Sequence, residues 1–467
     1  MTFIKYIAAA SLMAAIFFSC KKDSFIRSTD ARLAVSADTL NFDTVFTTAG
    51  SVTQRFKIYN LNDQKLLVSK IKLMGGPSSS FKINVDGVAA PEVNNLEIAA
   101  NDSLYVFVQV NIDPAAGNLP FLISDSILIN YNDHDKFVQL QAYGQNANFL
   151  RKTKITGNVT WTNDLPYVIL GGLVIDTTAT LSIQEGTRVY LHADAPIIVN
   201  GTLHVSGSVS DKVIFSGDRL DPDYKGLPAS WPGIYFMPSS KDNTVNYAVI
   251  KDSYQGLIAQ GRSLTANPKL KISQCIIDNA YDAGILGINT DIAADNSLIS
   301  NCGSNIILGL GGGYDFTHCT VVSYGTIYVS HKNPVLQVSN YIQQGNQTLT
   351  ADLNAVFTNC IFWGDAGSVE DEVQVFQEGT DHFEVKFIND LYKVVKDPIS
   401  TVSSNIIKNQ DPLFDSVNLE KQYFDFHFNK TPDAPAVDNG VLTSFPKDLD
   451  DHPRVNGPAP DLGAYER

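Results

Sequence analysis

The stretch between residues 218 and 271 carries the charged side chains that a polysaccharide lyase would need. Asp218, Asp221 and Asp223 are closely spaced carboxylates, and calcium prefers oxygen ligands of this kind. A lyase also needs a basic residue whose pKa is lowered by its surroundings. The candidates for this base are Lys251 (beside Asp252), Arg262, Lys269 and Lys271. A polar loop is the better explanation of the three aspartates, and solvated surface charges explain the basic residues equally well. The sequence therefore predicts no catalytic, cofactor-binding or metal-binding residue, with calcium as a cofactor only in the case of a lyase.

A second motif, Asn289-Thr290-Asp291, contains residue types found in glycosidase sites. It is similar to the Asn-Thr-Asp triplet that opens the active site of polygalacturonase-like hydrolases, a family that adds an Asp pair and a Gly-His-Gly motif further along. Glycoside hydrolysis needs two carboxyl groups flanking the scissile bond. The corresponding place here reads Gly311-Gly312-Gly313-Tyr314-Asp315, without either motif. We therefore interpret the triplet as an ordinary turn.

The amino terminus has the features of an export signal. Lys5 precedes an apolar run over residues 6–18, which is shorter than the roughly 20 residues of a transmembrane helix. The following Ser19-Cys20 resembles the lipobox of bacterial lipoproteins, although Phe17 stands where that family prefers Leu. The resemblance implies a signal peptide over residues 1–19, acylation of Cys20 and a tether over residues 20–30. The alternative is an ordinary signal peptide with an incidental cysteine.

The residues after Cys20 bear on the location of the protein. Lys21-Lys22-Asp23 is similar to the short charged signals that send Bacteroidetes lipoproteins to the outside of the outer membrane. The expected location is therefore the bacterial outer membrane, with a lipid anchor at Cys20 and exposure on the cell surface. The periplasmic face is the alternative.

Length and charge restrict the classes of partner. The chain has 467 residues, 44% of them apolar, and 34 basic against 49 acidic residues give a net charge of −15. This apolar content excludes disorder of the whole chain. An acidic chain without a basic stripe lacks the phosphate-neutralising charges of nucleic-acid binding, so no nucleic-acid partner is expected. The same acidity would repel uronic-acid polymers unless calcium or local basic residues intervene.

Residues 31–147 read as short strands separated by turns. The runs 54–59, 104–110 and 137–141 alternate polar and apolar residues, as half-buried antiparallel strands do. Seven or so strands in this length predict an immunoglobulin-like β-sandwich. The order of the runs, closing on Leu140-Gln141-Ala142-Tyr143-Gly144, resembles the ASH-type immunoglobulin domains of bacterial surface proteins. That resemblance implies a spacer or an interaction module.

Residues 151–405 contain an internal repeat. Cys275-Ile276-Ile277, Ser297-Leu298-Ile299 and Cys319-Thr320-Val321 follow one another at equal intervals of about 22 residues. The interval from Ala248 to Cys275 is somewhat longer, and the interval from Cys319 to Cys360 is close to two turns of the repeat. A period of about 22 built from short strands predicts a right-handed parallel β-helix of about 11 coils, with like residues stacked about 4.8 Å apart.

The repeat also predicts the environment of the cysteines. The small residues of the repeat should face the narrow interior, so Cys275, Cys319 and Cys360, together with Cys302, are interpreted as buried small residues. Cys275 and Cys319 would lie too far apart to form a bridge, and the absence of CxxC spacing disfavours a zinc site. The polar residues that precede the small ones, including His318, should form a ladder of hydrogen bonds from coil to coil.

The carboxyl end, residues 406–467, carries a series of motifs of its own. These are Asp411-Pro412-Leu413-Phe414, Phe424-Asp425-Phe426-His427-Phe428, Ala434-Pro435-Ala436-Val437-Asp438-Asn439-Gly440 and Pro460-Asp461-Leu462-Gly463-Ala464-Tyr465-Glu466. Their order resembles the terminal module of secreted right-handed β-helix repeat proteins of Bacteroidetes, within the pectate-lyase-like superfold. Because a solenoid has open ends, we expect a structural, capping role.

The fold class that follows is all-β: a sandwich, a parallel β-helix and a C-terminal module. The superfold contains lyases, hydrolases and non-catalytic binders, so the fold does not decide the function. The expected function is a surface lipoprotein whose β-helix binds a polysaccharide or a surface protein partner. The alternative is a polysaccharide lyase or glycoside hydrolase. For sugar binding, the tryptophans Trp161, Trp231 and Trp363 and the nineteen tyrosines are candidates for stacking faces, although Trp231 is better explained as packing at a coil corner.

Overall fold

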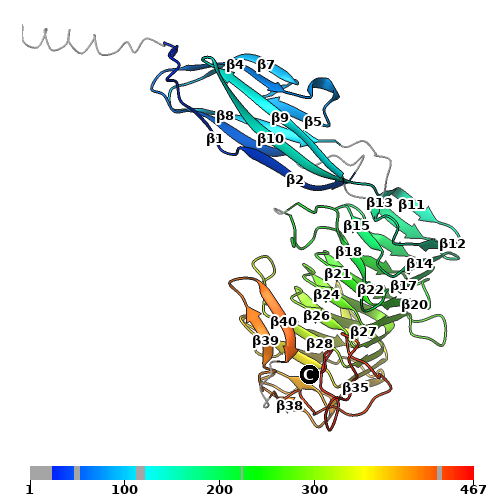
Figure 1. The fold of residues 1–467 in the computed structure, drawn as a ribbon. Helices are drawn as coiled ribbons and strands as arrows, with labels where there is room; N and C mark the ends of the chain where they lie inside the picture. Colours follow the sequence, from blue (N-terminus) through cyan, green and yellow to red (C-terminus); the bar gives the residue numbers. More distant parts are fainter. Residues whose placement is uncertain (1–23, 47–52, 112–120, 222–223, 429–433) are drawn as a thin grey trace, which may run out of the picture. The chain divides into compact units, whose positions relative to one another are not determined.

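The computed structural model describes residues 24–46, 53–111, 121–221, 224–428 and 434–467. The chain divides into two compact units between Asn146 and Ala147 (Figure 1). The predicted signal peptide, Cys20 and Lys21-Lys22-Asp23 lie outside the described residues. Within the described ranges, no helix is long and apolar enough to cross a membrane. The only helix described is a single 3-10 turn, η1 (Gly76–Ser78), and the other regular elements are strands.

The first unit is a sandwich of two five-stranded sheets. One sheet has the order β1 (Leu33–Val35), β3 (Gln54–Asn60), β8 (Ser103–Val110), β5 (Phe81–Val85) and β6 (Val88–Ala89). The other has the order β2 (Thr39–Phe46), β10 (His134–Gln145), β9 (Phe121–Tyr131), β4 (Leu66–Leu73) and β7 (Glu92–Ile98). Alternate residues such as Val106 and Val108 of β8 are fully buried between the sheets. The alternation seen in the sequence therefore marks which face of each strand meets the core.

The second unit is a parallel β-helix whose 26 strands form three ladders of stacked, parallel strands. Ladder A contains β12 (Asn158–Trp161), β14 (Thr180–Gln184), β17 (Thr202–Ser206), β20 (Asn243–Asn246), β23 (Leu270–Ser273), the second halves of β25 (Ala283–Asp295) and β27 (Ser304–Thr317), β32 (Leu353–Thr358), β35 (Phe383–Ile388) and β37 (Thr401–Ser404).

Ladder B contains the first halves of β11 (Asn148–Ile155) and β13 (Tyr167–Ile175), then β15 (Arg188–Leu191), β18 (Val213–Gly217), β21 (Ala248–Lys251), β24 (Ile276–Asp278), β26 (Leu298–Ser300), β28 (Thr320–Ser323), β33 (Ile361–Gly364), β36 (Leu391–Tyr392) and β38 (Ile407–Lys408). Ladder C contains the second halves of β11 and β13, β16 (Ile197–Val199), β19 (Ile234–Phe236), β22 (Gln255–Gln260), the first halves of β25 and β27, β29 (Leu336–Ser339) and β34 (Val373–Phe376).

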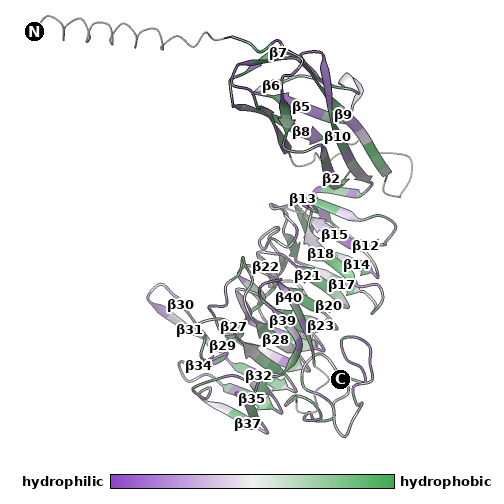
Figure 2. Cartoon of the chain, turned by 60° about the vertical axis from the view of Figure 1, so that its left-hand side comes forward, coloured by the Kyte–Doolittle hydropathy of each residue, from purple (hydrophilic) through white to green (hydrophobic). Residues whose placement is uncertain are grey.

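Stacking of like residues holds the coils together. The inward rings of Phe316, Phe357 and Phe387 come from successive rungs of ladder A, and neighbouring ring centroids lie 5.6 and 5.0 Å apart. The apolar stretches that build this interior are green in Figure 2. Burial of each such side chain contributes roughly 1.5–3 kcal/mol, so the continuous interior stabilises every coil against its neighbours.

Strand pairing confirms the predicted period but corrects one interval. Ile276 pairs with Leu298 and Leu298 with Thr320, so successive repeat blocks do lie on successive coils. Thr320 pairs directly with Ile361, however, so the interval between Cys319 and Cys360 is one long coil and not two. The extra length includes a hairpin of β30 (Tyr341–Gln344) and β31 (Gln347–Thr350), which projects from the coils in Figure 2. An insertion at a turn lengthens the chain without disturbing the stacked strands.

The small residues of the repeat face the interior, as predicted. Ala248, Cys275, Ser297, Cys319 and Cys360 are fully buried, and the four cysteines of the described residues are free thiols. Burial raises the pKa of Cys275 to about 12, which disfavours the reactive thiolate. These cysteines are therefore packing residues.

The C-terminal module lies along the side of the coils. Its hairpin of β39 (Phe414–Asn418) and β40 (Tyr423–Phe428) appears beside ladder B in Figure 1. Outward residues of ladder B, such as Leu298, Val322 and Ile361, share one apolar cluster with Phe426 and Leu462 of the module. Both faces of these strands are consequently buried, which explains why the repeat blocks read as continuous apolar runs.

Candidate functional site: a groove between ladder A and the C-terminal module

A column of polar residues connects the β-helix with the module. Six residues that precede strands of ladder B have a left-handed backbone, with φ between 44° and 56°: Tyr247, Gln274, Asn296, His318, Asn359 and Asn389. Asn and His tolerate this conformation better than most residues. Their backbone N–H groups bond to the next coil, as from His318 to the Thr358 carbonyl at 2.9 Å.

The side chains of this column bind mainly the module. Gln274 Nε2 donates to the Asp448 carbonyl at 2.7 Å, and Asn359 Nδ2 donates to the Val441 carbonyl at 2.8 Å. Asn359 also contacts His318 at 3.1 Å, which is the predicted kind of bond from coil to coil. Burial lowers the pKa of His318 to about 2, so its ring is neutral and cannot serve as a cationic acid.

Arg454 connects the polar column of the β-helix with the C-terminal module. Its guanidinium is buried and donates to the carbonyls of Gly463 and Ala464, each at 3.1 Å, and to Asn296 Oδ1 of the polar column. Glu466 Oε2 lies 3.6 Å from Arg454 Nη1. The motif at residues 460–466 therefore folds around an arginine that fixes the module to the coils.

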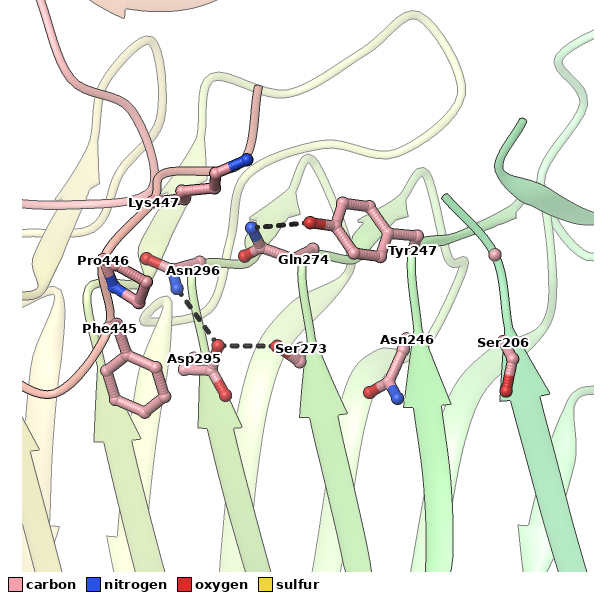
Figure 3. Close-up of a pocket in the computed structure, with 11 residues that line it drawn as sticks. Ser206, Asn246, Tyr247, Ser273, Gln274, Asp295, Asn296, Phe445, Pro446 and Lys447 are labelled. Atoms are coloured by element: carbon pink, nitrogen blue, oxygen red, sulfur yellow. Dashed lines mark hydrogen bonds between the residues drawn. The ribbon is translucent and has the colours of Figure 1, made fainter. Parts of the chain in front are cut away.

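The fixed module leaves a groove of about 370 Å³ beside ladder A. Ser206, Asn246, Ser273 and Asp295 occupy equivalent positions on four successive rungs and form a row along its floor (Figure 3). Phe445, Pro446 and Lys447 of the module line the groove beside them. We call this the ladder-A groove.

Hydrogen bonds order the floor of the ladder-A groove. Asp295 Oδ1 accepts from Ser273 Oγ at 2.7 Å and from Asn296 Nδ2 at 3.1 Å (Figure 3). Burial raises the pKa of the Asp295 carboxyl. Gln274 is 6% exposed, and its Oε1 has no hydrogen-bond partner among the described residues. The groove thus offers a free buried acceptor, an ordered carboxyl group and hydroxyl and amide groups at rung spacing, next to the ring of Phe445.

A second groove of about 490 Å³ lies between ladder B and the hairpin β39–β40. Its lining includes Asp278 and Ser300 of ladder B and Asp425, His427 and Tyr465 of the module. Burial raises the pKa of Asp278 to about 6, while Ser300 Oγ donates to it at 2.6 Å. We call this the ladder-B groove.

The charges on the module side of the ladder-B groove are paired. His427 Nε2 and Nδ1 lie 2.6 Å from Asp450 and 2.5 Å from Asp425. The hydrogen bond to Asp450, with that to Asp425, raises the pKa of His427 to about 9. Burial alone would raise the pKa of Asp425, but the bonds from His427 outweigh it and leave that pKa lowered. Two carboxyl groups of opposite pKa shift therefore line one groove.

The aspartates at residues 218–223 do not form a described calcium site. Asp218 lies 2.8 Å from His192, and Asp221 accepts from Arg219 at 3.0 Å. Asp223 lies outside the described residues. No group of three or more His, Cys, Asp or Glu side chains that could hold a metal ion occurs in the part of the chain that the structure describes.

The candidate bases of the sequence lie in different environments. Lys269 is fully buried, and its ammonium donates to the carbonyls of Pro238 at 2.9 Å and Ser240 at 2.8 Å. Arg262 pairs with Asp291 at 2.9 Å. Lys271 is exposed on ladder A, while Lys251 lies on ladder B beside the buried Asp252.

The Asn289-Thr290-Asp291 triplet shapes a bend in the chain. Asn289 has φ 44° at an irregularity in the middle of β25, and Thr290 is fully buried. Asp291 is tied to Arg262 and to the backbone N–H of Ser263 at 2.6 Å. The triplet therefore occupies the passage from ladder C to ladder A.

The tryptophan hypothesis is wrong. Trp161, Trp231 and Trp363 are at most 6% exposed, because they pack into the coils and the module interface. Trp231 donates from Nε1 to the Lys251 carbonyl at 2.9 Å, which fits its expected place at a coil corner. Among the tyrosines, which the sequence also offers as stacking faces, Tyr254 and Tyr281 are exposed, and their ring centroids lie 5.9 Å apart.

Sequence reasoning missed the two grooves, and it gave Asp425, His427 and Tyr465 of the C-terminal motifs only a capping role. Ser273 and Asp295 lie two residues before Cys275 and Ser297, which begin two repeat blocks of the sequence. Their position on adjacent rungs therefore follows from the period of the repeat. The places of Phe445 in one groove and of Asp278 opposite the hairpin in the other carried no such signal, because the module folds back over coils that are distant in the sequence.

Comparisons with known proteins assign no family. No family model matches the sequence, and no curated protein matches it. Among solved structures, the chain is similar to an ASH/PapD-like domain of human CEP192, with 10% identity over 27% of this chain and 90% of that one and a TM-score of 0.18. A protein of unknown function from Porphyromonas gingivalis W83 gives 12% identity over 27% and 60%, with a TM-score of 0.18.

A family 123 glycoside hydrolase from Clostridium perfringens gives 10% identity and a TM-score of 0.18. The match covers 28% of this chain and 31% of the hydrolase, so the chain spans about a third of that protein.

Proposed function

We propose that the protein is a lipoprotein of the bacterial outer membrane, exposed on the cell surface, whose β-helix binds a glycan in the ladder-A groove. The observation that carries the proposal is the row of Ser206, Asn246, Ser273 and Asp295 beside Phe445. A glycan presents hydroxyl groups and an apolar ring face at each sugar, and polar groups at regular spacing next to an aromatic ring complement both.

A binding screen tests this proposal. The full chain carrying Cys20→Ala, which removes the proposed acylation site, is titrated with a panel of plant, algal and host polysaccharides, and the products are assayed for new reducing ends and for unsaturated sugars. Saturable binding without product formation is the expected result. A chain that binds none of the panel but binds a surface protein would contradict glycan recognition.

A second candidate function, glycoside hydrolysis, is favoured by the ladder-B groove. Hydrolysis needs a protonated carboxyl group and an ionised one on the two sides of a sugar bond, and Asp278 and Asp425 have pKa values shifted in these opposite directions. New reducing ends that disappear in both Asp278→Asn and Asp425→Asn would establish this function. The matched control is Asp415→Asn, because Asp415 is an exposed carboxylate of the same hairpin.

The membrane anchor is tested separately. Cys20→Ala should move the protein from the membrane fraction to the soluble fraction and abolish labelling with a radioactive fatty acid. Unchanged membrane retention of the variant would contradict acylation at Cys20.

A further inference from the structure

One face of the sandwich is cationic, although the chain as a whole carries a charge of −15. Arg55 and Lys57 of β3 and Tyr105 and Phe107 of β8 alternate with buried residues, so they lie on the face that points away from the core. Arg55 pairs with Phe107 and Lys57 with Tyr105 across the two strands. Two cations and two rings therefore form one continuous surface, which we call the cationic platform.

The geometry of the platform joins the charges to the rings. Lys57 Nζ lies 4.7 Å and Arg55 Cζ lies 5.4 Å from the centroid of the Tyr105 ring. The rings of Tyr105 and Phe107 are stacked, with centroids 5.8 Å apart and an interplanar angle of 21°. Distances of this kind are those of cation–π contacts, which hold both cations over the sheet.

In the part of the chain that the structure describes, the positive charges of the platform and of Lys82 beside it have no acidic partners. Within the described residues, no carboxylate forms an ion pair with Arg55, Lys57 or Lys82. On the other sheet, by contrast, Lys70 and Lys72 both pair with Glu92, at 3.5 and 3.6 Å. The platform charges are thus free to meet an anionic ligand, which need not displace an existing ion pair.

A groove continues the platform. It has a volume of about 450 Å³, and its lining includes Phe107, Lys82, Asn84 and Gln109. Phe107 belongs to both the platform and the groove, and Lys82, the cation of the groove lining, joins the two cations of the platform. A long ligand could therefore lie over the rings of the platform and extend into the groove.

We propose that the cationic platform and its groove bind an anionic polysaccharide that carries carboxylate or sulfate groups. Such a polymer can place an apolar sugar face on an aromatic ring and an anionic group beside a neighbouring cation. The platform offers both, because its rings and its cations lie next to one another. Anionic membranes typically require clusters of four to eight basic residues, and nucleic acids require a longer basic stripe, so neither fits as well. This inference does not rest on the ladder-A groove, because it concerns a different unit of the chain.

Binding to matched polymers tests the inference. The full chain carrying Cys20→Ala is titrated with dextran sulfate, carboxymethyl dextran and neutral dextran at low and at physiological salt. We expect the two anionic polymers to bind, with affinity falling as salt rises, and neutral dextran to bind at least tenfold more weakly. Equal affinity for all three polymers would overturn the inference.

Two variants with equal charge change locate the site. Arg55→Gln/Lys57→Gln should weaken binding of the anionic polymers at least tenfold, because each charged hydrogen bond contributes about a factor of ten. Lys70→Gln/Lys72→Gln removes the same charge from the other sheet and should leave affinity within about twofold. Equal losses in both variants, or loss of anionic-vesicle binding in the platform variant with polymer binding unchanged, would overturn the inference. Equal melting temperatures of the two variants exclude misfolding.

Discussion

Arg454→Met is the substitution that most directly tests how the C-terminal module is held. The guanidinium contributes hydrogen bonds to the carbonyls of Gly463 and Ala464 and to Asn296, and it compensates the buried Glu466. Methionine fills similar space but leaves these acceptors without their donor. Breaking a buried ion pair from one side costs about 3–5 kcal/mol, and we expect this loss in the free energy of unfolding above the Glu466 pKa of about 7, where its carboxylate is ionised.

Urea unfolding followed by tryptophan fluorescence measures the effect. All three tryptophans lie in the second unit, and Trp363 belongs to the apolar cluster that joins the coils to the module. Lys447→Met is the matched control, since Lys447 is half-exposed and its ion pair with Asp451 lies at the surface; it should cost less than about 1 kcal/mol. A loss in Arg454→Met no larger than that of the control would refute the role assigned to the guanidinium.

Two further changes test other buried charged groups, Glu466 beside Arg454 and Lys269 in the coils. Burial raises the pKa of Glu466 from 4.5 to about 7. Because this folded-state pKa lies above the unfolded value, the contribution of Glu466 to stability is complete below pH 4.5 and is lost as pH rises through 7, by about 3 kcal/mol in all. Glu466→Gln should remove this loss from a pH series of urea unfolding curves, and an unchanged pH dependence would contradict the assignment. Lys269→Met leaves three carbonyls without the ammonium, those of Met237, Pro238 and Ser240. We expect a loss of about 2–4 kcal/mol in calorimetric stability with glycan affinity unchanged, and a stable variant that no longer binds glycan would show that Lys269 serves binding.

The periodic parts of the fold could be predicted from the sequence. Alternation in β8 indicated the sandwich, and the recurrence of Cys275, Ser297 and Cys319 indicated coils whose small residues face inward, as the structure has them. These patterns can be recognised within short stretches of sequence, because each strand of a solenoid has the same environment as the strand on the next coil. The interval to Cys360 was misread because an insertion at a turn looks the same as an additional coil.

The candidate sites depend on contacts between residues that are far apart in the sequence, and short sequence patterns do not predict such contacts. Gln274 lines the ladder-A groove, and it forms a hydrogen bond with Asp448, which is 174 residues away in the sequence. Tryptophan is a residue type that stacks on sugars, so the three tryptophans were candidates for sugar binding. All three are buried, because a side chain this large and apolar is more stable inside the protein than on its surface. Lysine is likewise a residue type that can act as a base, but the ammonium of Lys269 donates its hydrogen bonds to backbone carbonyls.

Glycan affinity of groove variants is the most direct test of the proposed function. Calorimetric titration of the polysaccharide selected by the screen is compared between Phe445→Ala and Phe376→Ala, and between Asp295→Asn and Asp315→Asn. Phe376 and Asp315 are exposed residues that do not line the ladder-A groove. Loss of one aromatic stacking contact should weaken binding about tenfold in Phe445→Ala, with a smaller loss in Asp295→Asn and none in the two controls. Unchanged affinity in both groove variants would contradict glycan binding in the ladder-A groove.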